Sequence, residues 1–428
     1  MIELKRHMGL FHTTMYGIGL ILGAGIYVLI GETAGIAGNA VWLSFIFGVI
    51  AAVFAGLSYA ELASMYPKAA AEYVFVKNAF RSNFLAFIIG WLTLFTSIIA
   101  AATVALGFGG YIAAIFDYPI IISAVLLIGI LSFVNFFGIR ESSWTNIVFT
   151  IIEAAGLALI IYLGFTFTTA EPINYFENPF GISGISLAFV LIFFAFIGFE
   201  DIVNIAEETK NPKKVLPQAI ILSISITAII YILVSLSAIQ VLSWQELGSS
   251  LAPLADVAER ALGSTGQLTM SLIALFATAN TVLIILLAGS RILYGMAVQR
   301  SLPLLLGKVH FKTKTPWVAV LVIMLISTIF VFIENIVTVA NITVFAIVIT
   351  FAMVNLSVIL LRYREPTLER PFRTPINIGK FPILSLFGVI ISAYMMTQFN
   401  AYVISVGVGI VAAGALFYVF YSKRMAAL

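Results

Sequence analysis

Two short stretches decide the fold: Gly23-Ala24-Gly25-Ile26, and Phe194-Ala195-Phe196-Ile197-Gly198-Phe199-Glu200. Each lies within an apolar run of about twenty residues, which is the length that crosses roughly 30 Å of hydrocarbon as a helix. Glycine lacks a Cβ, so it tolerates an unwound backbone and lets a ligand approach closely. The alternative use of such glycines is tight packing between membrane helices. Their placement, considered below, favours helix interruptions.

The composition places the surrounding chain in a lipid bilayer. Of its 428 residues, 62% are hydrophobic and 10% are charged, whereas soluble domains carry about 25% charged residues. Lipid offers the backbone no hydrogen-bond partner, so the apolar runs must be helical. The chain has no cysteine and three scattered histidines, His7, His12 and His310, which disfavours disulfides and metal clusters. We expect an all-α integral membrane protein without cofactor or metal.

Hydropathy predicts twelve transmembrane helices in a single membrane domain. Residues 1–168 and 169–364 would each hold five spans, and residues 365–428 would hold the last two spans and the C-terminal tail. The separation of spans 9 and 10 rests on Glu334-Asn335. The predicted spans are 11–31, 40–62, 84–116, 119–138, 144–167, 185–206, 217–242, 267–298, 317–334, 337–361, 381–398 and 401–421.

The basic residues predict the orientation. With the N-terminus inside, Arg260 is the single residue among the 22 Lys and Arg that falls on the outer side. Such a bias sets the topology of membrane proteins. We therefore expect a multi-pass protein of the cytoplasmic membrane with both termini in the cytoplasm. The net charge of +3 follows from this topology and does not indicate nucleic-acid binding, which needs cations clustered on one folded surface.

The two glycine-containing stretches lie in spans 1 and 6, five spans apart. This odd offset would turn a second five-helix unit upside down, and matching interruptions in two inverted halves indicate a transporter site. Backbone N–H groups freed at a break suit a carboxylate, and the freed carbonyls suit an ammonium group. Together they suit a zwitterionic amino acid, although the two halves share no obvious sequence identity.

The chain resembles the amino acid–polyamine–organocation transporter family over nearly its whole length, through the order and spacing of several motifs. It departs from the family pattern at Ala69-Ala70-Ala71, where glycines are usual, and in the loop 299–303. The motifs are the two stretches quoted above, Tyr59-Ala60-Glu61-Leu62, Gly90-Trp91, Asn135 with Gly138-Ile139-Arg140, Glu207-Glu208, Arg291-Ile292-Leu293-Tyr294 and Arg370-Pro371-Phe372-Arg373-Thr374-Pro375.

The resemblance implies a LeuT-type fold, with spans 1–5 and 6–10 as inverted repeats and spans 11 and 12 at the periphery. It implies that the backbone after Gly23 meets the substrate carboxylate, that carbonyls at both breaks meet the amine, and that Phe194 closes over the substrate. The implied substrate-binding residues are Ile21, Gly23, Ala24, Gly25, Ile26, Ala100, Ala101, Phe194, Ala195, Ile197 and Gly198.

Glu153 is an ionisable residue inside the membrane. It lies ten residues past Ser143, roughly 15 Å into span 5 at 1.5 Å per residue. A carboxylate at that depth costs at least about 2.5 kcal/mol and indicates function by default. The resemblance places it at the coupling site, where relatives carry a lysine or bind sodium. We expect Glu153 to carry a coupled proton; a cation ligand and a protonated structural group are the alternatives. Against sodium, span 8 offers Thr278, Asn280 and Thr281 without an adjacent hydroxyl pair.

Other acidic residues flank the membrane. Glu200 and Asp201 follow the span 6 stretch, and Glu200 is a candidate gating residue; lining a water-filled cavity is its plainer interpretation. Glu61, Glu207 and Glu208 lie near the inner interface, where ion pairs with basic loops are expected.

These observations favour a secondary transporter of α-amino acids that works by alternating access. An enzyme is disfavoured because no HExxH, GxSxG or phosphate-binding glycine loop occurs, and paired helix breaks disfavour a channel. Proton-coupled symport through Glu153 is the expected mechanism, with exchange or sodium-coupled symport as alternatives and a non-transporting receptor as a remote one. The apolar pocket walls favour neutral amino acids; Glu200 or Asp201 reaching the pocket would reverse that preference. The expected partners are an amino acid, protons and the lipid bilayer.

Overall fold

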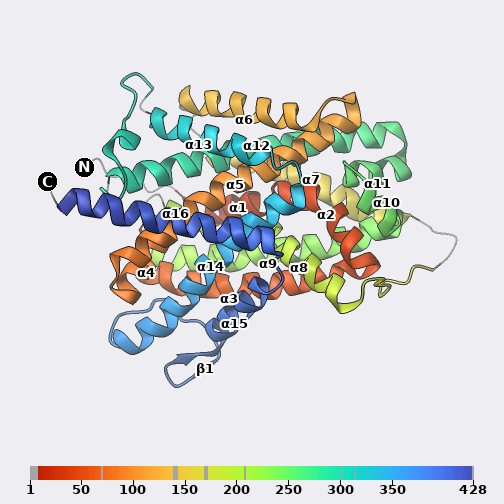
Figure 1. Cartoon of the computed structure of the whole chain (residues 1–428). Helices are drawn as coiled ribbons and strands as arrows, with labels where there is room; N and C mark the ends of the chain where they lie inside the picture. The colour runs from red at the N-terminus through yellow and green to blue at the C-terminus, as the bar shows by residue number, and fades with distance from the viewer. Residues whose placement is uncertain are drawn as a thin grey trace.

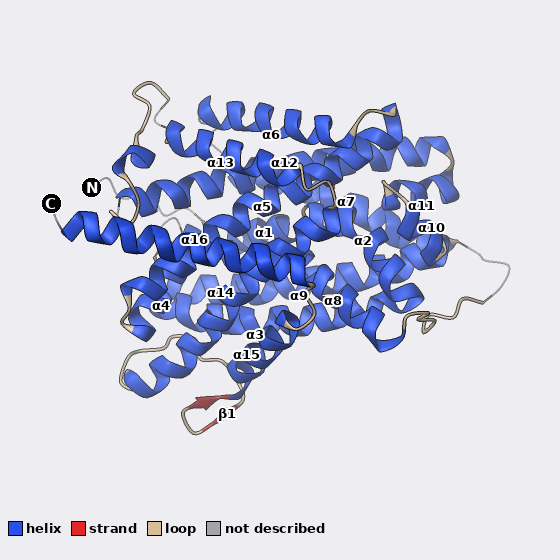
Figure 2. Cartoon of the chain, in the orientation of Figure 1, coloured by secondary structure: helices blue, strands red, loops and turns tan. Residues whose placement is uncertain are grey.

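The computed structural model describes residues 8–68, 71–137, 143–167, 172–206, 209–298, 300–313 and 315–426. This part of the chain is almost entirely helical, with one short hairpin beside α15 (Figure 2). The helices are α1 Leu10–Leu22, α2 Ala24–Ala37, η1 Gly38–Ala40, α3 Val41–Met65, α4 Ala71–Phe80, α5 Asn83–Phe116, α6 Ile120–Phe137, α7 Ser143–Thr166, α8 Gly181–Phe196, η2 Phe199–Ile205, α9 Pro212–Val241, α10 Trp244–Ser249, α11 Pro253–Leu262, α12 Ser264–Val298, η3 Leu304–Gly307, α13 Trp317–Val331, α14 Ile336–Arg364, α15 Ile383–Met396 and α16 Ala401–Ala426; the strands are β1 Asn377–Ile378 and β2 Phe381–Pro382.

The long helices are those of a multi-pass membrane protein. Within the described ranges, nine segments are long and apolar enough to cross a membrane. The first of them, Leu10–Met65, contains predicted spans 1 and 2, and the shorter apolar helices α13 and α15 coincide with predicted spans 9 and 11. The all-helical membrane class is confirmed, whereas the count of twelve spans and the inverted repeat stay predictions.

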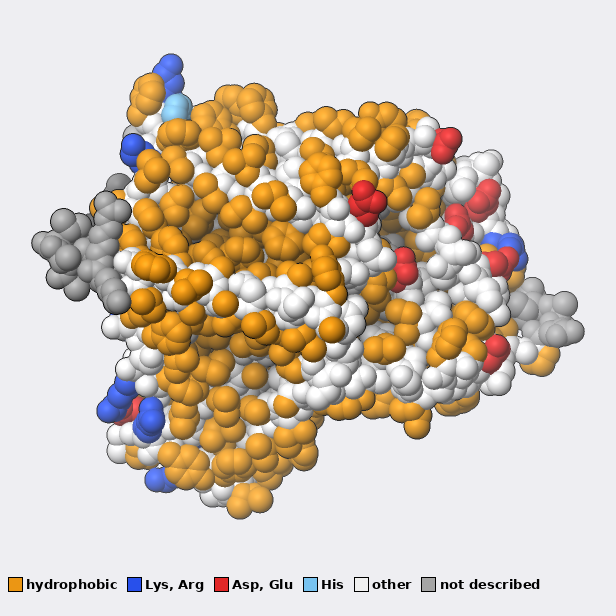
Figure 3. Space-filling model, viewed as in Figure 1, with side chains coloured by type: hydrophobic (Ala, Val, Ile, Leu, Met, Phe, Trp, Pro, Cys, Tyr) orange, Lys and Arg blue, Asp and Glu red, His pale blue; other side chains and the backbone are white. Residues whose placement is uncertain are grey.

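Charged side chains gather at the two ends of the molecule. The chain begins and ends on one side, and α10 and α11 lie at the opposite end (Figure 1). On the face shown in Figure 3, Lys and Arg lie mostly at the end that holds the termini, and Asp and Glu mostly at the other, with a hydrophobic surface between them. The side of the membrane on which each end lies stays a prediction.

The first predicted span is interrupted at Gly23. Helix α1 ends at Leu22 and α2 begins at Ala24, with Gly23 at φ −43° and ψ −153° between them. A Cβ at Gly23 would lie 2.4 Å from Thr281 Oγ1 on α12. The residue is therefore a glycine because a neighbouring helix touches the backbone at the break.

The sixth predicted span is interrupted at Ile197 and Gly198. Helix α8 ends at Phe196, Ile197 is extended, and Gly198 has φ +130° before the chain continues as η2. That φ favours glycine, and a Cβ there would lie 3.0 Å from the Leu20 carbonyl oxygen. Both helix interruptions expected from the sequence are present.

The two interrupted helices touch each other directly. A Cβ at Gly25 would lie 2.5 Å from Ala195 Cα, so the start of α2 and the end of α8 are in backbone contact. At the end opposite the termini, α10 lies on α2: a Cβ at Gly31 would meet the Leu247 carbonyl oxygen at 2.5 Å. The interrupted region is therefore enclosed by α8 on one side and covered by α10 farther along α2.

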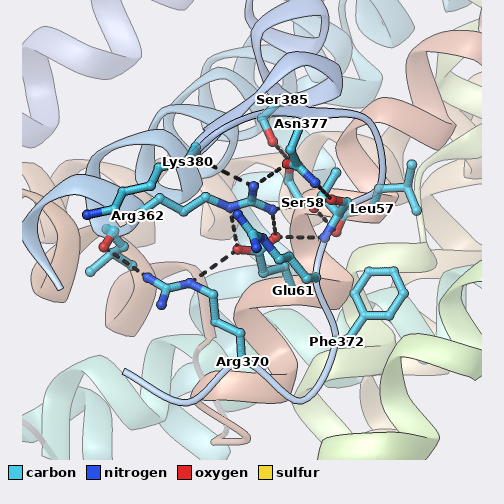
Figure 4. Close-up of polar contacts among 12 residues, drawn as sticks. Leu57, Ser58, Glu61, Arg362, Arg370, Phe372, Asn377, Lys380 and Ser385 are labelled. Atoms are coloured by element: carbon cyan, nitrogen blue, oxygen red, sulfur yellow. Dashed lines mark hydrogen bonds and ion pairs between the residues drawn. The ribbon is translucent and has the colours of Figure 1, made fainter. Parts of the chain in front are cut away.

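A buried ion pair fixes the segment 365–382 to the helix bundle (Figure 4). Arg362 on α14 donates to both carboxylate oxygens of Glu61 on α3, at 2.9 and 2.5 Å, and their side chains are 2% and 1% exposed. The Thr374 backbone N–H also donates to Glu61, at 2.8 Å, and Arg370 approaches it at 3.5 Å. The ion pair expected for Glu61 is confirmed, with partners 301 and 309 positions away in the sequence.

Glu72 on α4 makes stability depend on pH. It is buried and accepts a hydrogen bond from the Tyr59 hydroxyl at 3.2 Å, and burial raises its pKa from 4.5 to about 7. The unfolded chain releases this proton at lower pH than the folded chain does, so stability is lost as pH rises from 4.5 to 7.

We expect Glu72→Gln to raise the free energy of unfolding by about 3 kcal/mol at pH 8 and to leave it unchanged at pH 4. Glutamine keeps an oxygen that can accept from Tyr59 but carries no charge to bury. Thermal unfolding of both proteins in detergent across this pH range measures the difference. A gain that is equal at both pH values would contradict this explanation.

Candidate functional site

A cavity lies where the two interruptions meet. It has a volume of about 60 Å³ and is bounded by α1, α2, α5, α8, η2, α12 and α14. Most of the residues implied by the family resemblance surround it, while Gly23, Ile26, Ala101 and Glu153 lie outside its lining. The predicted residues in the lining are Ile21, Ala24, Gly25, Ala100, Phe194, Ala195, Ile197, Gly198 and Glu200.

The sequence interpretation missed a polar stripe on α5. Thr93, Thr96 and Ser97 line the cavity together with Ala100 and Val104. These positions recur at helical spacing on one face, so extending the face of Ala100 towards the start of span 3 identifies them. Their hydroxyls donate to carbonyls four residues earlier in α5, and each hydroxyl oxygen keeps acceptor capacity.

The N–H end of the break in span 1 faces α12. The Ala24 N–H donates to Thr281 Oγ1 at 3.2 Å, and the same hydroxyl donates to the Ala277 carbonyl at 2.9 Å. Thr281 thus occupies a donor that was expected to meet a substrate carboxylate. The next two residues, Gly25 and Ile26, belong to the first turn of α2, where backbone N–H groups lack partners within the helix.

The carbonyl end of both breaks faces Tyr231 on α9. Its hydroxyl lies within hydrogen-bond distance of the Ile21 carbonyl and, at 3.1 Å, of the Ala195 carbonyl. A hydroxyl donates one proton, so it serves one carbonyl at a time and leaves the other for an ammonium group. The Phe194 carbonyl accepts from the Ile197 N–H at 3.2 Å. Tyr231 was not expected from the sequence, where it is one tyrosine in an apolar span.

Two carboxylates border the cavity on the η2 side. Glu200 is 4% exposed and accepts from the Gly198 N–H at 2.8 Å, and Asp201 accepts from Asn204 Nδ2 at 3.1 Å. Neither carboxylate belongs to an ion pair among the described residues. The lining is therefore acidic on this side although its walls are mostly apolar.

Glu153 is fully buried behind the break in span 1. Its Oε1 accepts from Asn280 Nδ2 on α12 at 3.2 Å, and its Oε2 has no hydrogen-bond partner within the described chain. The Tyr27 hydroxyl donates to the Glu153 backbone carbonyl at 2.6 Å. A buried carboxylate with one oxygen unpaired is costly, which favours the neutral form.

Comparison with known proteins shows the family. The amino acid permease family model matches residues 8–421. The chain belongs to the amino acid permease family. This permease is thus a transporter rather than an enzyme, and the resemblance drawn from its motifs is confirmed. Of those motifs and departures, Gly138-Ile139-Arg140, Glu207-Glu208, Ala69-Ala70 and Gln299 lie outside the described residues.

Individual relatives of this permease differ in what they carry. It is 30% identical to the branched-chain amino acid permease BcaP of Bacillus subtilis over 395 residues, which is 87% of this chain and 84% of the relative. It is 31% identical to cationic amino acid transporter 4 of Mus musculus, covering 85% of this chain and 61% of the relative. It is 28% identical to the methylthioribose transporter of Bacillus subtilis, covering 99% and 94%.

Proposed function

We propose that this permease is a secondary transporter of α-amino acids that works by alternating access in the cytoplasmic membrane, with both termini in the cytoplasm. One observation carries the proposal: a cavity at two helix interruptions is lined by Ala24 and Gly25 at the start of α2 and by Ile21 and Ala195, whose carbonyls share the Tyr231 hydroxyl. Such a cavity offers partners for both charged ends of a zwitterion. Residues 1–168 and 169–364 would then be the two inverted repeats, with residues 365–428 peripheral.

Proton-coupled symport is the mechanism that Glu153 supports best. The carboxylate is buried beside the break, has one oxygen without a partner, and forms no ion pair within the described chain. Sodium would need several oxygen ligands, whereas Asn280 offers Glu153 an N–H donor. Exchange without net proton movement is the alternative.

The acidic side of the cavity favours an amino acid with a positively charged side chain. Glu200 and Asp201 both line the cavity, which is the condition under which the preference for neutral amino acids reverses. A second cation on the substrate would neutralise carboxylates that no basic side chain pairs. Neutral amino acids are the second candidate, because most of the lining is apolar and one relative is a branched-chain amino acid permease.

We propose Phe194 and Glu200 as gating residues, since both lie at the span 6 break and line the cavity.

Uptake into liposomes tests both the substrate and the coupling. With the membrane potential clamped at zero, an inward proton gradient is expected to drive accumulation of radiolabelled L-lysine, with a limit of about tenfold per pH unit for one proton per substrate. Glu153→Gln is expected to abolish this accumulation and to retain lysine exchange. The matched control is Glu259→Gln, which alters an exposed carboxylate on α11.

Other results of the uptake experiment would change the proposed substrate or the proposed coupling. Accumulation of L-leucine but not of L-lysine would replace the basic substrate with a neutral one. Uptake that ignores the gradient and needs internal amino acid would make the permease an exchanger. Transport of neither amino acid would overturn the substrate assignment.

A further inference from the structure

Two adjacent residues of α12 contact the two sites on which symport depends. Asn280 Nδ2 donates to Glu153 Oε1 at 3.2 Å, and Thr281 Oγ1 accepts from the Ala24 N–H at 3.2 Å. Glu153 is the proposed proton carrier, and the Ala24 N–H is a proposed donor to the substrate carboxylate. A single helical turn therefore joins the proton site to the substrate site.

Thr281 holds a place that a substrate oxygen would take. Its proton is directed to the Ala277 carbonyl at 2.9 Å, so its oxygen is left to accept from Ala24. Thr281 packs closely against the break in span 1, because a Cβ at Gly23 would lie 2.4 Å from Thr281 Oγ1. While this contact persists, a substrate carboxylate must compete with Thr281 for the Ala24 N–H.

We propose that Asn280 and Thr281 form a coupling turn that makes the Ala24 N–H available to substrate when Glu153 is protonated. A hydrogen bond to an ionised carboxylate is roughly twice as strong as one to a neutral group. Ionised Glu153 therefore keeps the Asn280 side chain hydrogen-bonded, which keeps Thr281 Oγ1 hydrogen-bonded to the Ala24 N–H. Protonation weakens the first bond, the turn relaxes, and Thr281 releases the N–H. By reciprocity, a bound carboxylate favours protonation of Glu153.

The surroundings of Glu153 leave Asn280 as its polar side-chain contact. Tyr27 on α2 and Tyr231 on α9 are the titratable groups that interact with Glu153 electrostatically. Helix α12 has no titratable side chain from Ser264 to Ser290. The other helices packed on α7 bring His12 and Tyr16 from α1, and Asp256, Glu259 and Arg260 from α11; none of these forms an ion pair with Glu153 within the described chain.

The inference rests on the proposed function and is tested by substrate binding as a function of pH. Binding of radiolabelled L-lysine, or of L-leucine if the wild type binds that instead, is measured on the purified full chain between pH 5 and 8. Wild-type affinity is expected to fall by a factor of about 5 to 150 as pH rises, which is the usual range of coupling between two sites. Glu153→Gln supplies the uncoupled reference.

Asn280→Leu and Thr281→Val are expected to lose this pH dependence and to bind substrate at pH 8 as tightly as at pH 5. The first removes the link to Glu153, and the second removes the competitor for the Ala24 N–H. Thr278→Val is the matched control, because its buried hydroxyl bonds to carbonyls of its own helix, and it should keep the wild-type pH dependence. A merely damaged protein would bind more weakly at every pH.

Two outcomes would overturn the inference in different ways. If Glu153→Gln loses the pH dependence while both α12 variants keep it, the coupling turn is wrong. The same holds if Asn280→Leu and Thr281→Val both bind substrate more weakly at every pH. In either case the proposal of proton coupling through Glu153 is unaffected. If Glu153→Gln itself keeps the wild-type pH dependence of binding, both proton coupling through this residue and the coupling turn are wrong.

Discussion

Arg362→Met is expected to lower the free energy of unfolding by about 3 kcal/mol, because the buried carboxylate of Glu61 loses its bidentate partner and keeps only the longer approach of Arg370, at 3.5 Å. The wild-type pair is bidentate and almost fully buried. Glu61 also accepts a hydrogen bond from the Thr374 N–H, and Arg362 donates one to the Asn377 side chain (Figure 4). Loss of Arg362 should therefore also loosen the segment 365–382 from α3.

Thermal unfolding in detergent and proteolysis of the segment 365–382 measure these two effects. The control is Arg81→Met: its pair with Glu365 is exposed, and exposed pairs contribute about 0–1 kcal/mol. Replacing both members of the bidentate pair, Glu61→Leu with Arg362→Met, should recover part of the stability because neither is then left buried without the other. Arg370 loses Glu61 in this variant but keeps its hydrogen bonds to the carbonyls of Leu361, Glu365 and Leu368. Equal, small losses for Arg362→Met and Arg81→Met would contradict the assignment of a buried, stabilising network.

Gly25→Val is expected to reduce transport by about 100-fold or more, since displacement of site groups by about 1 Å has effects of that size. A Cβ at residue 25 would lie 2.5 Å from Ala195 Cα and 2.8 Å from Ala195 Cβ. Backbone cannot move aside as a flexible side chain can, so α2 and α8 must separate and the cavity between them must change shape. Initial rates of amino acid uptake measure the effect.

Gly129→Val is the matched control for this change. Gly129 lies on α6, and a Cβ there would meet nothing within 4 Å. We expect this variant to insert, fold and transport like the wild type. Near-normal uptake by Gly25→Val would show that the contact between the interrupted helices is not needed for transport.

The helix interruptions could be predicted because their cause is local. Glycines such as Gly23 and Gly198 stand in apolar runs long enough to be spans, and their spacing of five spans matches inverted halves. The buried position of Glu153 followed from its distance along a helix. The repeat itself remains a prediction because the two halves share no obvious sequence identity.

The partners at the site could not be predicted because they come from distant spans. Tyr231 reaches the Ile21 carbonyl from 210 positions away, and Thr281 reaches Ala24 from 257. A hydroxyl in an apolar span can bond within its own helix, as Thr278 does, so residue type alone does not say which one faces a break. The polar stripe at Thr93, Thr96 and Ser97 was the exception, since its spacing on one helical face was visible in the sequence.

Protection of a single cysteine by substrate tests the central claim most directly. The chain has no cysteine, so Ala100→Cys places one thiol in the cavity lining, and Ser249→Cys on α10 supplies an exposed control. In liposomes, saturating L-lysine should slow labelling of Ala100→Cys by a methanethiosulfonate reagent and leave Ser249→Cys unaffected; L-leucine replaces lysine if the wild type transports that instead. An unchanged labelling rate at Ala100→Cys, with an amino acid that the variant still transports, would show that substrate binds elsewhere.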